Sequence, residues 1–431
     1  RYRYQPQVRQ YLRRKLREKM SPDAIAELNI RYGEAYEQRG DYDNAIKHYQ
    51  DSGSMHLVAG IIEDKGEAFM AAGRYESLAR WISGIPESAI KSKPLLAYVC
   101  AKTSEHLGEM EKVESMYVMA ETGFNKKGDK HGTFICVYAL AEYYFMKEMY
   151  RKSLEMATRA LPLADEPLDR ITVLTRMMRS SLIIGDTTRA FQILRQADEA
   201  IDDTMVEARL VLSTENMAVN WMTGDFKGSM ETALGLEEDA TPQTTMQTRF
   251  HVLFFKMSNL RETGQYTEAL AIAEEAADFL SGEDKIQKLI FELQKAVILL
   301  CVGDGTAGRE LMERIIVKIG RSAPLGPYFS FNYLGDYYRR QGMPDKAIEL
   351  LIPELRSHRE KDKKYSIASS LVNLGANKLR RVDAPDNTGI ADLKEASGIA
   401  QENNYRFILT QVHFQQAWRA LGLRDEAKAL D

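Results

Sequence analysis

The glycine-rich segment Gly303–Glu310 is the stretch whose residue types come nearest to nucleotide chemistry. A phosphate-binding loop needs Gly-x-x-x-x-Gly-Lys-Ser/Thr, because backbone amides cradle the phosphate, the lysine neutralises charge and the hydroxyl binds Mg²⁺. Here Arg309 stands in the lysine position and Glu310 in the hydroxyl position. An expected helix also precedes the segment, where the motif requires a strand. We therefore interpret it as a structural turn.

The histidines and cysteines show no spacing that is typical of catalysis or metal binding. There is no HExxH pair, no CxxC pair and no GxSxG elbow. The cysteines are odd in number and far apart, which favours core thiols in a reducing cytoplasm. For the histidines, surface or packing roles are the simpler interpretation. The sequence thus predicts no enzyme, no metal and no cofactor within this chain. The residues concerned are His48, His56, His106, His131, His251, His358, His413, Cys100, Cys136 and Cys301.

A recurring glycine marks where the elements of this chain begin and end. The spacing is 33 residues from Gly40 to Gly73, and steps of 37 to 40 follow from Gly108 to Gly342. The step from Gly342 to Gly422 is 80 residues, with Val382 at its midpoint. A glycine in the left-handed conformation commonly ends a helix, so the ladder predicts helical hairpins. Its other members are Gly185, Gly224, Gly264, Gly303 and, in an equivalent place, Glu148.

Two columns of small residues support this register. One lies five residues after the marker and the other seven before it, which places small side chains where the two helices of a hairpin cross. The columns are Ala45, Ser153, Ala190, Ser229, Ala269, Gly308, Ala347 and Ala427, and Gly33, Gly66, Ala101, Ala141, Ala296, Gly335 and Gly375. The sequence therefore predicts an all-α, right-handed superhelix of about ten to eleven antiparallel hairpins. A longer loop follows Arg380, and the next helix is expected to begin near Thr388.

The first 20 residues stand apart from this array. They are strongly basic, with Glu18 as the only acid, and Val8, Leu12 and Leu16 lie at helical spacing. We interpret residues 1–20 as the last helix of a preceding domain, with a nucleic-acid or partner-docking helix as the alternative. Ser21 suits a helix N-cap and Pro22 the first helical position, so the repeat domain is expected to cover residues 21–431.

Composition limits the function classes. The net charge is −4 and the pI is about 6.1, which argues against non-specific nucleic-acid binding by the whole chain. No apolar run approaches the roughly 20 residues of a membrane-spanning helix. The sequence begins at Arg1 and stops at Asp431 just after a new helix is expected to begin, so we interpret it as a piece of a larger protein.

The repeats resemble the tetratricopeptide repeat family. Residues 332–342 match its first-helix motif, and residues 40–46 match its turn and second helix. The usual period of that family is 34, whereas most steps here are 39 or 40, so the hairpins are elongated and the family's groove positions transfer poorly. Residues 2–16 also look like the final winged-helix segment of MalT-type regulators, which are ATP-dependent members of the LuxR family. In those proteins a stretch like residues 30–49 leads into the helical repeats.

The second resemblance implies an excised sensor domain. In that family an NTPase and a winged helix precede the sensor, and a DNA-binding helix-turn-helix follows it. The sensor would bind a small-molecule inducer or a regulatory protein or peptide in a concave groove, and would contact other domains of the same polypeptide. ATP would bind only the missing NTPase domain, and DNA only a missing C-terminal domain. The alternative is a stand-alone cytoplasmic tetratricopeptide adaptor that binds a peptide or protein segment.

By analogy with shorter repeats, the first helix of each hairpin should line the groove. Residues ten, six, three and two places before each marker are then expected to point inward. An aromatic side chain flanked by charges and amides can recognise a small polar ligand or a peptide. The alternative is that the aromatic residues belong to the core and the arginines are simply solvated. The predicted ligand-facing residues are Trp221, Phe254, Arg261, Asn332, Asp336, Arg339 and Arg340.

Overall fold

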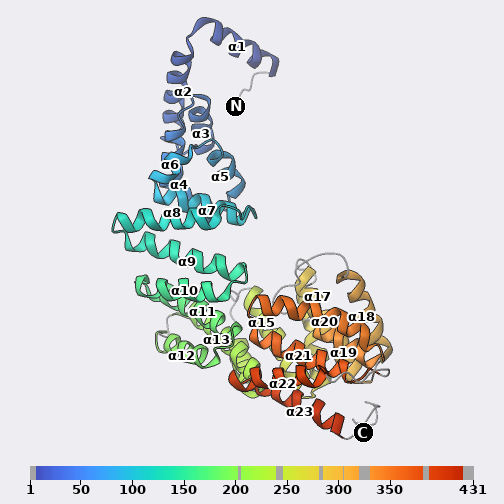
Figure 1. The fold of residues 1–431 in the computed structure, drawn as a ribbon. Helices are drawn as coiled ribbons and strands as arrows, with labels where there is room; N and C mark the ends of the chain where they lie inside the picture. The colour runs from blue at the N-terminus through green and yellow to red at the C-terminus, as the bar shows by residue number, and fades with distance from the viewer. Residues whose placement is uncertain are drawn as a thin grey trace. The chain divides into compact units, whose positions relative to one another are not determined.

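The computed structural model describes residues 6–201, 205–238, 246–280, 285–303, 305–319, 331–381 and 388–420. Within these ranges every regular element is a helix, which confirms the all-α prediction. Contacts divide the chain into two compact units. The first comprises Arg1–Tyr143 and Pro162–Ala164, and the second comprises Tyr144–Leu161 and Asp165–Asp431. Figure 1 shows the helices in chain order.

The first unit begins with a single helix and continues as hairpins. Ser21 accepts a hydrogen bond from the backbone amide of Ala24 (3.2 Å), so the expected N-cap at the start of α2 is present. The core of this unit is built around Ile46, Tyr49 and Ile62. Its helices are α1 (Pro6–Lys19), α2 (Pro22–Glu37), α3 (Tyr42–Asp51), α4 (Met55–Ala71), α5 (Tyr75–Ile82), the short α6 (Glu87–Ser92), α7 (Pro94–His106), α8 (Val113–Lys126) and α9 (Lys130–Met146), which ends just beyond the unit boundary.

The second unit continues the same pattern. Buried apolar residues of consecutive helices form its core, with clusters around Phe250, Leu371 and Ile315. Its helices are α10 (Tyr150–Ala160), α11 (Pro167–Ile183), α12 (Thr187–Asp198), α13 (Val206–Thr223), α14 (Phe226–Glu238), α15 (Met246–Glu262), α16 (Tyr266–Phe279), α17 (Lys285–Cys301), α18 (Gly305–Ile319), α19 (Asn332–Arg340), α20 (Pro344–Glu360), α21 (Lys364–Lys378), α22 (Thr388–Glu402) and α23 (Arg406–Ala420). Among the described residues, and leaving aside the short α6, the first unit contains three hairpins between α2 and α8, and the second contains six between α11 and α22, followed by α23.

The turn between the two helices of a hairpin has the predicted backbone conformation. Gly264 has φ +79°, and the corresponding glycines from Gly40 to Gly342 also have positive φ. Glu148, which takes the place of a glycine, has φ +57°. The start of α22 at Thr388 is confirmed as well, whereas Val382, Gly422 and Ala427 lie outside the described residues. The marked positions are therefore the turns of a helical-repeat superhelix.

The small residues lie where two helices touch. Ala269 is fully buried. A Cβ atom added to Gly33 would lie 2.3 Å from the ring of Tyr49, and one added to Gly335 would lie 2.9 Å from Leu351. In each case the residue it would meet lies on the second helix of the same hairpin. The predicted close contact is therefore present, and larger side chains would push the helices apart.

Two glycines of α4 test a second kind of close contact, between the first helices of neighbouring hairpins. A Cβ atom added to Gly66 would lie 2.7 Å from Val99, whereas one added to Gly60 would meet no atom within 4 Å. Val99 is fully buried and β-branched, so it cannot turn away easily. We expect Gly66→Ala to lower the free energy of unfolding by about 1–3 kcal/mol. Gly60→Ala should leave it unchanged or raise it by about 0.5–1 kcal/mol. Urea unfolding of both variants measures the difference, and equal effects would contradict the close contact.

Candidate functional site

Arg261 is a predicted site residue that makes several polar contacts. It lies near the end of α15, is 7% exposed and pairs with Glu262. Its Nη1 donates to Gln294 Oε1 and to Tyr333 Oη, both at 3.2 Å. Burial alone would lower the pKa of Arg261, but Glu262 and Tyr333 outweigh it and the pKa is raised. Arg261 is therefore a buried, charged junction between three first helices, α15, α17 and α19.

Asp336 on α19 lies between two further predicted residues. It forms ion pairs with Arg339 and Arg340, the latter with Nε 2.9 Å from Oδ2. Burial raises the pKa of Asp336, but the two arginines outweigh it and the pKa lies below its ordinary value. The side chains of Asp336 and Arg340 are 30% and 35% exposed, while Arg339 is 8% exposed. Asp336 and Arg340 are thus the charged part of the predicted site that solvent reaches.

The two aromatic candidates lie deeper. Phe254 is 5% exposed and packs on Phe250 and Phe255, with ring centroids 6.2 and 5.2 Å apart. Phe254 is a core residue, which is the alternative that the sequence left open. Trp221 is half-buried, and its ring lies 5.8 Å from that of Tyr365. The Trp221 indole Nε1 is buried, and no described residue accepts a hydrogen bond from it.

Successive first helices are joined by a repeating polar contact. Arg179 Nε donates to Glu215 Oε1, and Ser258 Oγ lies 3.2 Å from Gln294 Oε1. In both pairs a residue six places before one marker meets a residue nine places before the next. The predicted residue Asn332 donates from Nδ2 to Ser369 Oγ at 3.0 Å, between α19 and α21. These contacts hold the first helices of neighbouring hairpins in register.

The column nine residues before each marker was not predicted from the sequence. Its members Glu215, Phe255, Gln294 and Tyr333 contact Arg179, Trp221 or Arg261. Each lies nine residues before a marker glycine, namely Gly224, Gly264, Gly303 or Gly342, so the repeat spacing could have identified this column from the sequence. Tyr365 could not be found in this way, because it contacts Trp221 from a helix more than 140 residues further along the chain. It is a contact of the tertiary fold.

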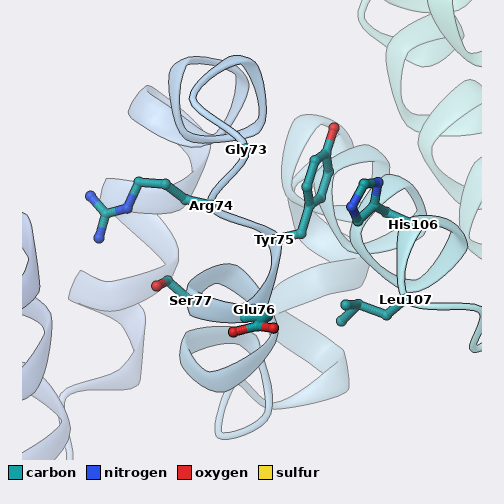
Figure 2. Close-up of a pocket in the computed structure, with 7 residues that line it drawn as sticks. All are labelled: Gly73, Arg74, Tyr75, Glu76, Ser77, His106 and Leu107. Carbon is teal, nitrogen blue, oxygen red and sulfur yellow. The ribbon is translucent and has the colours of Figure 1, made fainter. Parts of the chain in front are cut away.

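An open pocket of about 470 Å³ lies in the first unit, beside the turns of the α4–α5 and α7–α8 hairpins (Figure 2). Tyr75 stacks on His106 there, with ring centroids 3.8 Å apart. Arg74 is engaged elsewhere, since it pairs with Asp43 and lies over Phe69 and Trp81. The lining residues are Gly73, Arg74, Tyr75, Glu76, Ser77, His106 and Leu107. None of the seven predicted site residues belongs to this pocket.

The described residues offer little reactive chemistry. They include no group of His, Cys, Asp and Glu side chains that could hold a metal ion. Cys100 and Cys136 are buried, and burial raises the pKa of each thiol to about 12, so neither is a ready nucleophile. Gly303 has positive φ just after α17, and α18 begins at Gly305, as expected for a structural role of this segment. No helix in the described part of the chain has both the length and the apolar character needed to cross a bilayer.

Comparisons with known proteins add only a general likeness. No protein-family profile matches the sequence, and no curated protein matches it. Among solved structures, the apo form of the quorum sensor NprR from B. thuringiensis is 12% identical, with a TM-score of 0.45 over 84% of this chain and 99% of that one. The Cut9-Hcn1 hetero-tetramer of the APC/C is 11% identical, with a TM-score of 0.43 over 92% of this chain and 84% of that one. The assignment as a tetratricopeptide-like array rests on the repeats described above.

Two histidines of the second unit, the buried His251 and the half-buried His358, predict acid sensitivity. Burial, followed by the charge of Arg179, lowers the pKa of His251 to about 4, and burial with Lys363 and Lys361 lowers that of His358 to about 4. The unfolded chain binds these protons near pH 6.5, so folding stability is full above that pH and falls between pH 6.5 and 4. Each histidine should account for up to about 3 kcal/mol of that loss. In unfolding titrations at pH 7 and pH 4.5, His251→Gln should remove part of the difference. An unchanged difference would contradict the assignment.

Proposed function

We propose that this chain is a non-catalytic binding module that recognises its partner through polar side chains on the first helices of the second unit. The buried, charged junction at Arg261 is the observation that carries this proposal. An ion pair taken out of water contributes little or no net stability compared with apolar residues of similar size. A scaffold with no recognition task could fill this position with leucine. Arginine instead offers a planar set of donors suited to carboxylates and amides.

The partner proposed here is a peptide or a protein segment, with a small-molecule inducer as the second candidate. Asp336 and Arg340 present one carboxylate and one guanidinium to solvent on the same helix face. Such a pair can bind the amide and charged groups of an extended chain. Arg261 and Gln294 would act behind it, by fixing the positions of α17 and α19 relative to α15. Phe254 contributes to this arrangement through the core and has no proposed contact with the partner.

The wider context that we propose is the sensor part of a MalT-type regulator. It is supported by the resemblance of residues 2–16 to the end of a winged-helix segment, and by α1, whose Val8, Tyr11 and Leu12 are exposed. ATP and DNA would bind other domains of that polypeptide. A stand-alone adaptor, the alternative hypothesis, would lack those domains. A P-loop encoded upstream of Arg1 and a helix-turn-helix encoded downstream of Asp431 would favour the regulator, and their absence from the gene would favour the adaptor.

A thermal-shift screen of peptides and metabolites tests the binding role, because a ligand at a hundredfold its dissociation constant adds about 2.7 kcal/mol to stability. For a ligand found in this way, Arg340→Ala should weaken binding by roughly 10- to 100-fold, since charged hydrogen bonds contribute about 1.5–3 kcal/mol. The matched control is Arg359→Ala, which removes an exposed arginine that pairs with Glu395 between α20 and α22. Equal affinities of the two variants, measured by calorimetry, would contradict the proposed site.

A further inference from the structure

Turns from the two ends of the second unit lie against one another. We call this contact the seam, and its polar part consists of Glu148, Arg151, Lys361, Asp362 and Lys363. Glu148, in the turn before α10, forms ion pairs with Lys361 and Lys363 in the turn between α20 and α21. Arg151 Nε lies 2.7 Å from Asp362 Oδ2. More than 200 residues of sequence separate the two sides, so the seam joins the beginning of this unit to its end.

The seam continues along the next two hairpins. The hydroxyl of Thr187, which begins α12, donates to the backbone carbonyl of Asn403 at 2.9 Å. Phe226, which begins α14, meets Phe407 of α23 edge to face, with ring centroids 5.3 Å apart. Gly224 lies so close to Phe407 that an added Cβ atom would be 3.2 Å from its amide nitrogen. Helices α13 and α23 are in contact there.

The backbone at the seam is unusual. Among the described residues, three that are not glycine have positive φ: Glu148 at +57°, Asp362 at +51° and Asn404 at +55°. All three lie in the seam turns. Other hairpins have glycine where Glu148 stands, and glycine adopts this conformation without strain. Glutamate here costs conformational energy but supplies the carboxylate that both lysines bind. Strain of this kind is concentrated at functional and switching elements.

The inner face begins directly behind the seam. Tyr365 follows the seam lysines on α21 and packs on both Trp221 and Tyr405, with centroids 5.8 and 5.1 Å away. The predicted residue Trp221 is therefore covered by a side chain whose position depends on the seam. Trp221 is half-buried, but its Nε1–H is buried, so a partner that binds this group needs the side chains packed on the indole, Tyr365 among them, to move.

We propose that the seam is a gate: it opens to expose Trp221 to the partner and closes to cover it. The role of this gate rests on the proposed binding function. The opening itself is a property of the free protein and can be measured without a partner. The polar contacts are the kind that salt weakens, because Glu148, Lys361 and Arg151 are 32%, 37% and 67% exposed. Burial opposes ionisation of Glu148, but the two lysines hold its pKa below the ordinary value, so the carboxylate is charged at neutral pH.

Hydrogen exchange of the free chain at neutral pH tests the gate. Amides in peptides covering 148–152 and 361–366 should exchange roughly threefold to tenfold faster in 0.5 M than in 0.05 M NaCl. Glu148→Gly removes the carboxylate while suiting the left-handed turn, and it should give the same acceleration at low salt. The control is Glu237→Gln, because Glu237 and its partner Lys256 are 37% and 14% exposed, close to the 32% and 16% of Glu148 and Lys363. This control should leave exchange in both seam peptides unchanged.

Two results would overturn the gate. One is unchanged exchange in both seam peptides when salt is raised and when Glu148 is replaced. The other is an equal acceleration in α16 and α17, which would indicate global loosening of the unit. These outcomes are independent of the binding function, which fails separately if no ligand stabilises the chain in the thermal-shift screen.

Discussion

The close approach of two helices at a small residue is the constraint on which this structure depends. A bulky side chain at Ala269, Gly33 or Gly335 would separate the helices of a hairpin, and the apolar residues around them would lose their contacts. Because each hairpin buries its faces against its neighbours, a displaced helix in one repeat would also displace the helices of the next. The left-handed turn at each marker is the second half of this constraint, since it sets the direction of the returning helix.

Polar contacts add order to this apolar framework. The contacts from Arg179 to Glu215 and from Ser258 to Gln294 recur at the same repeat positions, so they fix the register between first helices. Arg261 on α15 extends this network to α19 through its hydrogen bond to Tyr333. The same side chains thus serve the fold and define the surface that we propose for recognition. The exposed portion, Asp336 and Arg340, lies at the edge of that network.

The sequence predicted what depends on local spacing. The turns from Gly40 to Gly342, the replacement by Glu148 and the start of α22 at Thr388 are confirmed, because a left-handed residue and a small contact residue leave a periodic mark. Contacts between distant repeats leave no such mark. The pairing of Glu148 with Lys361, or of Trp221 with Tyr365, depends on how far the array curves, and that is the sum of many small rotations. The burial of Phe254 could not be predicted either, because its position in the repeat is compatible with both the core and the groove.

Zero-length carbodiimide cross-linking followed by mass spectrometry tests most directly whether the second unit closes on itself. This reagent joins a carboxylate to an amine only when the two are in contact. The structure predicts a product between Glu148 and Lys361 or Lys363, in yield comparable to the product between Glu237 and Lys256 of neighbouring helices. A strong Glu237–Lys256 product with no product from Glu148 would contradict the closed arrangement, and with it the covering of the inner face.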